Sequence, residues 1–418
     1  MILLKLTWRS LWNRRISLML TLLSVAISVS LLLGVEYIRK EARNSFMNTI
    51  SGTDLVVGAR SGPVQLLLYS VFRIGNATNN ISWESYQEFG KHKWVKWTVP
   101  LSLGDSHKGY RVLGTSTDYF KHYRYANKKN LAFKTGKPFA GVFDAVIGAE
   151  VADTLGYSVG DSIVLAHGAG STSFANHDNK PFTVTGILEL TGTPVDRTVH
   201  VSLEGIEAIH IGWESGAKPG IEIPAASAMK MDLEPKVITA FLVGLKNRSA
   251  TFRLQRQINE YPREALLATV PGVALAELWN ALGQFEVVLR IITFFVLIAG
   301  MLGMLTTLLS TLNERRREMA ILRAVGAYPG QVFLLFIMEA VVISLLGGLL
   351  GMLITGVIVI FAQPWVASEY GLYLNYWLPQ TADWMLLGLV VALATLFSIL
   401  PGWIAYRRSL QDGLTVRV

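Results

Sequence analysis

The stretch that decides the fold is "NERRREMAILRAVGAYPG", Asn313 to Gly330, which stands between two long apolar runs. It contains three consecutive arginines, Arg315 to Arg317. The residues that follow are good helix formers, and Glu314 and Glu318 lie near the N-terminal end, where the helix dipole favours negative charge. Gly326 can end a helix, and a Pro-Gly pair then turns the chain. The stretch predicts a short helix between two membrane helices.

One side of this helix is predicted to be apolar. Met319, Leu322 and Val325 recur at a spacing of three, and Ile321 lies on the same broad arc. The opposite side carries arginine. A topogenic signal alone would explain the arginines, because basic residues keep a loop in the cytoplasm. It does not explain the apolar arc, which indicates a surface on which a cytoplasmic partner acts.

The composition of the chain points to a membrane protein. Of its 418 residues, 51% are hydrophobic and 16% are charged, which is too little polar material for an ordinary soluble protein. A net charge of +8 could suit a nucleic-acid binder, but the basic clusters flank apolar runs and do not interleave with aromatics on a soluble face. We therefore expect no nucleic-acid partner. The chain has no cysteine, which excludes disulfides and thiolate metal sites.

Four apolar runs are long enough to cross a bilayer core of about 30 Å. They cover residues 16–35, 287–312, 331–362 and 385–406. The first lacks a cleavage site and is expected to be an uncleaved anchor. Residues 36–286 show the alternating patterns, glycine turns and mixed charges of a folded domain. The predicted fold is an α-helical membrane protein with four transmembrane helices and a large α+β extracytoplasmic domain inserted between helices 1 and 2.

The distribution of Lys and Arg predicts the orientation. Residues 1–15, 313–330 and 407–418 are rich in basic residues, whereas residues 363–384 contain none. Basic segments next to membrane helices stay in the cytoplasm. Both termini are therefore expected there, and the large domain and the short loop 363–384 outside. Residues 1–15 are interpreted as an interfacial helix, with a cytoplasmic extension of the first span as the alternative.

The segment "NERRREMAILRAVGAYPGQVFLLFIMEAVVISLLGGLLG" closely resembles the signature of the FtsX/MacB-type (mechanotransmission, type VII) ABC transporter permeases with large periplasmic domains. The resemblance covers essentially the whole chain. It implies that residues 313–330 couple to an ATPase and that a glycine run packs the membrane helices. The residues implied in coupling are Glu314, Arg315, Arg316, Glu318, Met319, Ala320, Leu322, Arg323, Ala324 and Gly326, and those in packing are Gly347, Gly348 and Gly351.

The same resemblance implies an assembly in the bacterial inner membrane. Two permease copies, identical or paralogous, would join a cytoplasmic ABC ATPase dimer, with a periplasmic or lipoprotein partner as a further candidate. The sequence contains no G-x-x-x-x-G-K-S/T phosphate loop, so we expect a chain that is not an enzyme and binds no cofactor, with ATP and Mg in the partner. The outer domain is expected to divide into a porter-like part, residues 36–117 and 225–286, and a sabre-like insertion, residues 118–224.

The spans contain little that could conduct a polar solute. Apart from Glu339, the interiors of the four runs carry no ionisable residue, although transport pathways usually retain such groups. This fits mechanotransmission, in which an ATPase moves the 313–330 helix and the spans pass the motion outward. The cargo would be a lipophilic or periplasmic substrate such as a lipoprotein, peptide or siderophore.

Two alternatives remain open. A non-transporting signal transducer would use the outer domain to activate a partner such as a cell-wall hydrolase, but family members of that type usually have a smaller domain. An accessory role in metal acquisition would rest on the histidine-rich loop, where His167, His177 and Asp178 could ligate a divalent metal. Solvated loop histidines are the plain explanation, and no arrangement of residues indicates catalysis.

Overall fold

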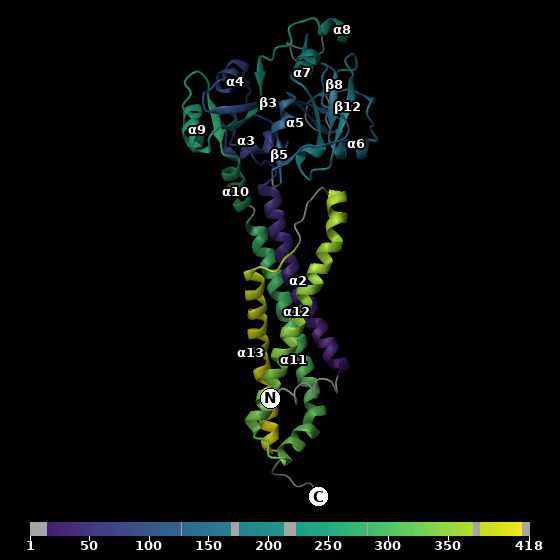
Figure 1. Cartoon of the computed structure of the whole chain (residues 1–418), viewed down its shortest axis with the longest axis vertical. Coiled ribbons are helices and arrows are strands. Elements are labelled where there is room, and N and C mark those ends of the chain that lie inside the picture. The colour runs from purple at the N-terminus through teal and green to yellow at the C-terminus, as the bar shows by residue number, and fades with distance from the viewer. Residues whose placement is uncertain are drawn as a thin grey trace. The chain divides into compact units, whose positions relative to one another are not determined.

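The computed structural model describes residues 15–126, 128–168, 175–212, 223–281, 283–370 and 377–411. The chain divides into two compact units (Figure 1). The membrane unit comprises Met1–Ala42, Gly283–Pro364 and Leu374–Val418, and the sheet domain comprises Arg43–Leu282 and Trp365–Tyr373. The predicted interfacial helix, except for Arg15, and the end of the predicted C-terminal tail lie outside the described residues.

Four long helices build the membrane unit. They are α2 (Arg15–Met47), α11 (Gly283–Ala324), α12 (Pro329–Tyr370) and α13 (Thr381–Gln411). Each contains a stretch long and apolar enough to cross a membrane: Leu18–Met47, Glu286–Ser310, Pro329–Val366 and Thr381–Arg407. This confirms the prediction of four membrane helices. At about 1.5 Å per residue, each helix is longer than the roughly 30 Å of a bilayer core, so the helices extend beyond it.

The segment 313–330 is not a separate helix. Its first part is the C-terminal end of α11, which runs without a break from Gly283 to Ala324. The sequence contains neither glycine nor proline between Gly303 and Gly326, so nothing interrupts the helical hydrogen bonds where the apolar span ends. The second span and the predicted coupling helix therefore form one continuous element.

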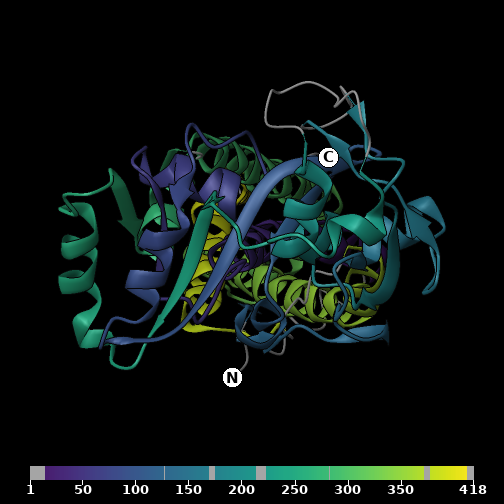
Figure 2. The ribbon, with the colours of Figure 1, turned by 90° about the horizontal axis from the view of Figure 1, so that it is seen from above.

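The sheet domain is built on a mixed twelve-stranded sheet. Its main path has the order β16-β1-β15-β3-β4-β13-β8-β12-β7, and β9, β10 and β11 pair off this path. Figure 2 shows β3 as the long curved blue strand. The strands are β1 (Leu55–Ala59), β3 (Val95–His107), β4 (Tyr110–Thr115), β7 (Phe133–Gly136), β8 (Asp144–Ile147), β9 (Ser162–Ile163), β10 (Ala166–His167), β11 (Ala175–Asn176), β12 (Phe182–Leu188), β13 (Thr198–Ser202), β15 (Ala240–Leu245) and β16 (Leu266–Thr269).

Two small ribbons and several short helices complete this domain. The ribbons pair β2 (Ile81–Ser82) with β14 (Val237–Ile238) and β5 (Arg124–Tyr125) with β6 (Lys129–Asn130). The helices are α3 (Pro63–Ser70), α4 (Trp83–Gly90), α5 (Asp118–His122), α6 (Ala149–Leu155), α7 (Leu203–His210), α8 (Ala225–Ala228), α9 (Thr251–Asn259) and α10 (Pro271–Ala281), with the 3-10 turns η1 (Pro194–Arg197) and η2 (Arg248–Ala250).

The sheet is continuous across the two predicted parts of the outer domain. Strand β4, from the porter-like part, pairs in parallel with β13, from the sabre-like insertion, in a register that joins Thr198 to Arg111 and Ser202 to Thr115. All residues of β13 are buried, so this junction lies in the core. The C-terminal boundary predicted for the sabre-like insertion, residue 224, follows a segment, residues 213–222, that lies outside the described residues.

Candidate functional site

The turn after α11 brings the predicted coupling segment, residues 313–330, against the other membrane helices. Met319 is buried in a cluster with Val332 and Phe336 of α12 and Ala405 of α13. Gly326 has a φ of +100°, a left-handed conformation that glycine adopts without strain, and α12 begins at the proline three residues later. The Met319 cluster therefore packs the adjoining ends of α11, α12 and α13 together.

The predicted apolar arc divides between the inside and the outside of the membrane unit. Met319 points inward, whereas Ile321 and Val325 are exposed, Val325 by 84%, and Tyr328 in the turn is exposed as well. The backbone of the remaining coupling residues up to position 324 is helical. The structure describes only the backbone, and not the side chains, of Glu314, Arg315, Arg316, Glu318, Ala320, Leu322, Arg323 and Ala324.

The glycines of α12 allow close contacts with neighbouring helices. A Cβ atom on Gly347 would lie 2.9 Å from the Cβ of Val25, and one on Gly351 would lie 2.7 Å from the carbonyl oxygen of Ala26, both on α2. Gly348 meets Leu387 of α13. Small residues of this kind let two membrane helices approach closely. Close packing is important in lipid because the lipid tails are as apolar as the helices, so no hydrophobic effect drives the helices together. The sequence left the partner helix open, and the structure assigns the Gly347 and Gly351 face to α2 of the same chain.

Polar side chains add to the contact between α2 and α12. The hydroxyl of Thr355 lies 3.1 Å from that of Ser30 and donates to the carbonyl of Gly351 at 2.9 Å. Such hydrogen bonds stabilise membrane helix pairs modestly. Glu339, which the sequence singled out, is buried in α12.

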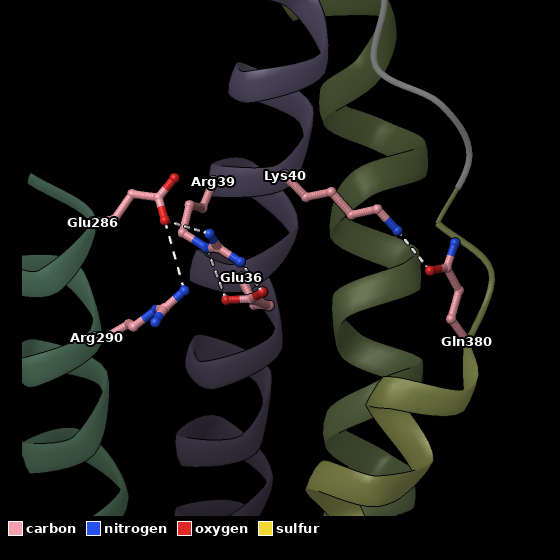
Figure 3. A network of polar contacts seen from close by, with 6 residues as sticks. All are labelled: Glu36, Arg39, Lys40, Glu286, Arg290 and Gln380. Carbon is pink, nitrogen blue, oxygen red and sulfur yellow. Dashed lines mark hydrogen bonds and ion pairs between the residues drawn. The ribbon is translucent and has the colours of Figure 1, made fainter. Parts of the chain in front are cut away.

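An ion-pair network joins α2 and α11 where the chain enters and leaves the sheet domain (Figure 3). The guanidinium of Arg39 donates to both carboxylate oxygens of Glu36 on its own helix and, at 2.7 Å, to Glu286 at the start of α11. Arg290 lies 3.6 Å from the same Glu286 carboxylate, and Lys40 donates to Gln380 before α13. We call Glu36, Arg39 and Glu286 the clasp.

Sequence reasoning missed the clasp. Arg39 and Glu286 stand 247 residues apart, and their only signal is their position at the outer ends of two apolar runs. The side chain of Arg39 is 15% exposed and that of Glu286 18%. Charged hydrogen bonds with this degree of burial are stronger than exposed surface pairs.

A second polar cluster lies within the sheet domain. It contains Asp105, His167, His177 and His210, whose ligand-type atoms all lie within 4.8 Å of one another. Two of the three candidates from the sequence, His167 and His177, are therefore brought together. Asp178 is exposed in the turn after His177 and is not part of the cluster. Asp105 and His210 were missed because they come from distant parts of the chain.

The electrostatics of the cluster favour a negative Asp105. Burial raises the pKa of this carboxyl, but the hydrogen bonds and charges of His167 and His210 outweigh it and bring the pKa to about 2. Burial lowers the pKa of His210, whereas Asp105 raises it more, so the net shift is upward. Burial, followed by the charge of His210, lowers the pKa of His177 to about 4, so its imidazole is neutral at pH 7.

The fold and these sites define a four-helix membrane protein with an inserted α+β domain. Residues 18–261 match the family described as MacB-like periplasmic core domain, and residues 290–413 match the FtsX-like permease C-terminal family. The chain belongs to the FtsX/MacB-type family of ABC transporter permeases. It is an inner-membrane protein with a periplasmic domain, as the sequence resemblance predicted.

Similar proteins include two kinds of exporter. The chain is 24% identical over 301 residues to the macrolide export ATP-binding/permease protein MacB of Nitrobacter winogradskyi, covering 71% of this chain and 42% of the relative. It is 22% identical over 386 residues to the pyoverdine export ATP-binding/permease protein PvdT of Pseudomonas savastanoi pv. phaseolicola, covering 87% and 54%. The chain spans about half the length of the curated relatives it matches.

Two solved structures also align with the chain. The periplasmic region of MacB from Actinobacillus actinomycetemcomitans aligns at 9% identity and a TM-score of 0.34, covering 56% of this chain and 95% of that one. The extracellular domain of the noncanonic ABC-type transporter YknZ from Gram-positive bacteria aligns at 13% identity and a TM-score of 0.31, covering 52% and 99%.

Proposed function

We propose that this chain is the membrane subunit of an exporter that couples ATP hydrolysis by a separate cytoplasmic ATPase to conformational work in the periplasm. The continuity of α11 carries the proposal, because this one helix contains both the whole second membrane span and the coupling segment up to Ala324. The relatives' names combine ATP binding with a permease, whereas this sequence contains no phosphate-loop motif. We assign ATP and Mg to a partner chain, and the termini and coupling segment to the cytoplasm.

The length of α11 explains how a push at one end reaches the other. Its 42 residues span about 63 Å at a rise of about 1.5 Å per residue. Neither glycine nor proline interrupts its last 21 residues, 304–324, so a displacement at Ala324 moves this half of the helix as a rod. The buried Met319 cluster transfers the same displacement to the adjoining ends of α12 and α13.

The clasp would transmit this motion to a second helix. Arg39 connects α2, which leads into the sheet domain along the chain, with α11, which leads out of it. A shift of α11 along its axis must either carry α2 with it or break hydrogen bonds to a charged group, which contribute about 1.5–3 kcal/mol each. Both connections to the sheet domain would therefore move together.

The exposed apolar residues of the coupling segment are proposed to contact the ATPase. Ile321 lies near the end of α11 and Val325 and Tyr328 lie in the following turn, all exposed and beyond the apolar span that ends at Ser310. Apolar side chains in a segment whose sequence is rich in arginine suit a partner surface with a hydrophobic pocket and an acidic rim. We assign this surface to the ATPase dimer, with a second permease copy completing the assembly.

The proposed cargo is amphiphilic. The relatives are named for macrolide and pyoverdine export, and apart from Glu339 the interiors of the four predicted spans lack the charges of a polar solute path. A substrate taken from the membrane surface or the periplasm, such as a siderophore, peptide or lipoprotein, fits work done by the outer domain.

Affinity purification of the tagged chain in mild detergent, followed by mass spectrometry, tests the function. We expect an ABC ATPase to be recovered with the wild-type chain and lost with Val325→Asp, because the aspartate places a charge in an apolar contact. Phe252→Asp is the matched control, since Phe252 is equally apolar and 74% exposed but lies on α9 of the sheet domain. Glu318→Arg should leave the chain inserted while uncoupling ATP hydrolysis from transport.

Two results would contradict the proposal. One is a folded chain that retains no ATPase in any preparation. The other is a Val325→Asp variant that retains the ATPase and its transport at the wild-type level. Recovery of an ATPase together with a cell-wall hydrolase, without export of any substrate, would instead support the signal transducer.

A further inference from the structure

We propose that Asp105, His167, His177 and His210 bind a zinc ion within the periplasmic sheet domain. The four residues come from separate elements that meet at one point. Asp105 lies on β3 and His167 on β10, and the two are direct register partners in the antiparallel β3–β10 pair. His177 follows β11, which pairs with β10, and His210 is the last residue of α7.

Backbone hydrogen bonds hold these positions in place. The amide of His177 donates to the carbonyl of Leu165 at 2.9 Å, which returns the chain beside β10. The buried ammonium of Lys180 donates to the carbonyl of Ala208 at 2.7 Å, and this contact joins the turn after His177 to the end of α7. The cluster is therefore built on paired strands and a fixed helix end rather than on a free loop.

The distances among three of the ligand atoms suit a tetrahedral ion, and the fourth ligand, His177, lies within 4.8 Å of them. The Nδ1 atom of His167 lies 3.1 Å from the Nε2 atom of His210 and 3.3 Å from the Oδ1 atom of Asp105. The third edge, from His210 Nε2 to Asp105 Oδ1, is also 3.3 Å. Zinc bonds of about 2.0–2.1 Å in a tetrahedron require ligand atoms about 3.3–3.4 Å apart. A cation above this triangle would contact all three atoms, whereas one proton can lie along only one edge.

The tautomer of His210 leaves its Nε2 atom available to bind a metal ion. Its Nδ1 atom lies 2.9 Å from the carbonyl oxygen of Ile206, and a carbonyl only accepts, so Nδ1 carries the proton. The lone pair of the neutral ring is then on Nε2, which faces the cluster. A backbone carbonyl that orients the second nitrogen is the usual support of a metal-binding histidine.

The ligand chemistry selects the ion. Three imidazoles and one carboxylate form a nitrogen-rich set that suits zinc and related transition metals, whereas calcium and magnesium require oxygen ligands. The buried Asp105 supplies a negative charge, with its side chain 2% exposed. The side chain of His167 is 52% exposed, which gives the ion a route from solvent. A bound ion would fasten β10 and β11 to β3 and α7.

Zinc binding can be measured on the full-length chain in detergent, purified with a histidine-free tag and stripped with a chelator. After zinc is added back to the stripped chain, we expect elemental mass spectrometry to find one zinc ion per chain. We also expect saturating zinc to raise the unfolding temperature of the sheet domain by about 5–10 °C. The measurement needs no ATPase or transport, so its outcome is independent of the proposed function.

Variants locate the site. His167→Gln is the decisive change, because an exposed side chain can be replaced without disturbing the fold. We expect it to weaken zinc binding at least tenfold, and Asp105→Asn to weaken it further by removing the charge. His92→Gln and Asp178→Asn, outside the cluster, should bind as the wild type does. Binding below one zinc per chain, or wild-type affinity in His167→Gln and Asp105→Asn, would overturn the proposal.

Discussion

Replacing Gly351 by alanine tests the close contact between α12 and α2. The new Cβ atom would lie 2.7 Å from the carbonyl oxygen of Ala26 and 2.9 Å from the Cβ of Val29. Carbon contacts are comfortable at about 3.5–4.0 Å, so the two helices must separate by about 0.8 Å at this point. Neither neighbour can rotate away, because one is a backbone atom and the other is a β-carbon.

The expected cost follows from this overlap. Inserting a methyl group into a packed interface costs about 1–3 kcal/mol, whereas the helix preference of alanine over glycine returns up to about 1 kcal/mol. Gly388 on α13 is a matched control, since no atom lies within 4 Å of its Cβ position. Comparing Gly351→Ala with Gly388→Ala cancels the helix preference, and we expect the first to be less stable by about 1–3 kcal/mol.

Thermal unfolding of both variants in the same detergent measures this difference. We expect the unfolding temperature of Gly351→Ala to fall below that of Gly388→Ala by several degrees, because about 1 kcal/mol corresponds to about 2–4 °C in a domain of this size. Equal stability of the two variants would refute the reasoning, since it would show that α12 and α2 are not in contact at Gly351.

Three further changes have defined outcomes. Burial lowers the pKa of His200 in the folded protein to about 3. In the unfolded chain the pKa is the ordinary 6.5, so at pH 5 the unfolded state has gained a proton and the folded state has not. Stability should therefore fall by about 2 kcal/mol between neutral pH and pH 5, and denaturant unfolding of His200→Gln should show a smaller fall. Gly148→Ala should cost about 3 kcal/mol by chemical denaturation or prevent folding, because its Cβ meets two carbonyl oxygens of η1. Arg39→Gln should destabilise the membrane unit by about 1–3 kcal/mol in the same measurement and lower coupled transport, whereas Arg290→Gln, whose ion pair is longer and more exposed, should change either by little.

The sequence by itself determined the properties that depend on neighbouring residues. The length of each apolar run defines the four spans, and the alternation in "FTVTGIL" corresponds to β12, Phe182–Leu188. The ordered signature from Glu314 to Gly351 identified the family, because many residues in one short segment carry it. Hydrophobicity, helix preference and turn chemistry act over a few residues, so they can be read without knowing what packs against them.

Only the tertiary structure decided which distant residues meet. Asp105 and His210 join His167 and His177 because β3, β10 and α7 converge, and Arg39 reaches Glu286 because α2 and α11 lie side by side. The glycine run predicted a close helix contact, but only the packing assigned Gly351 to α2. Such pairings depend on strand register and helix packing over the whole chain, and a pattern of nearby residues does not contain that information.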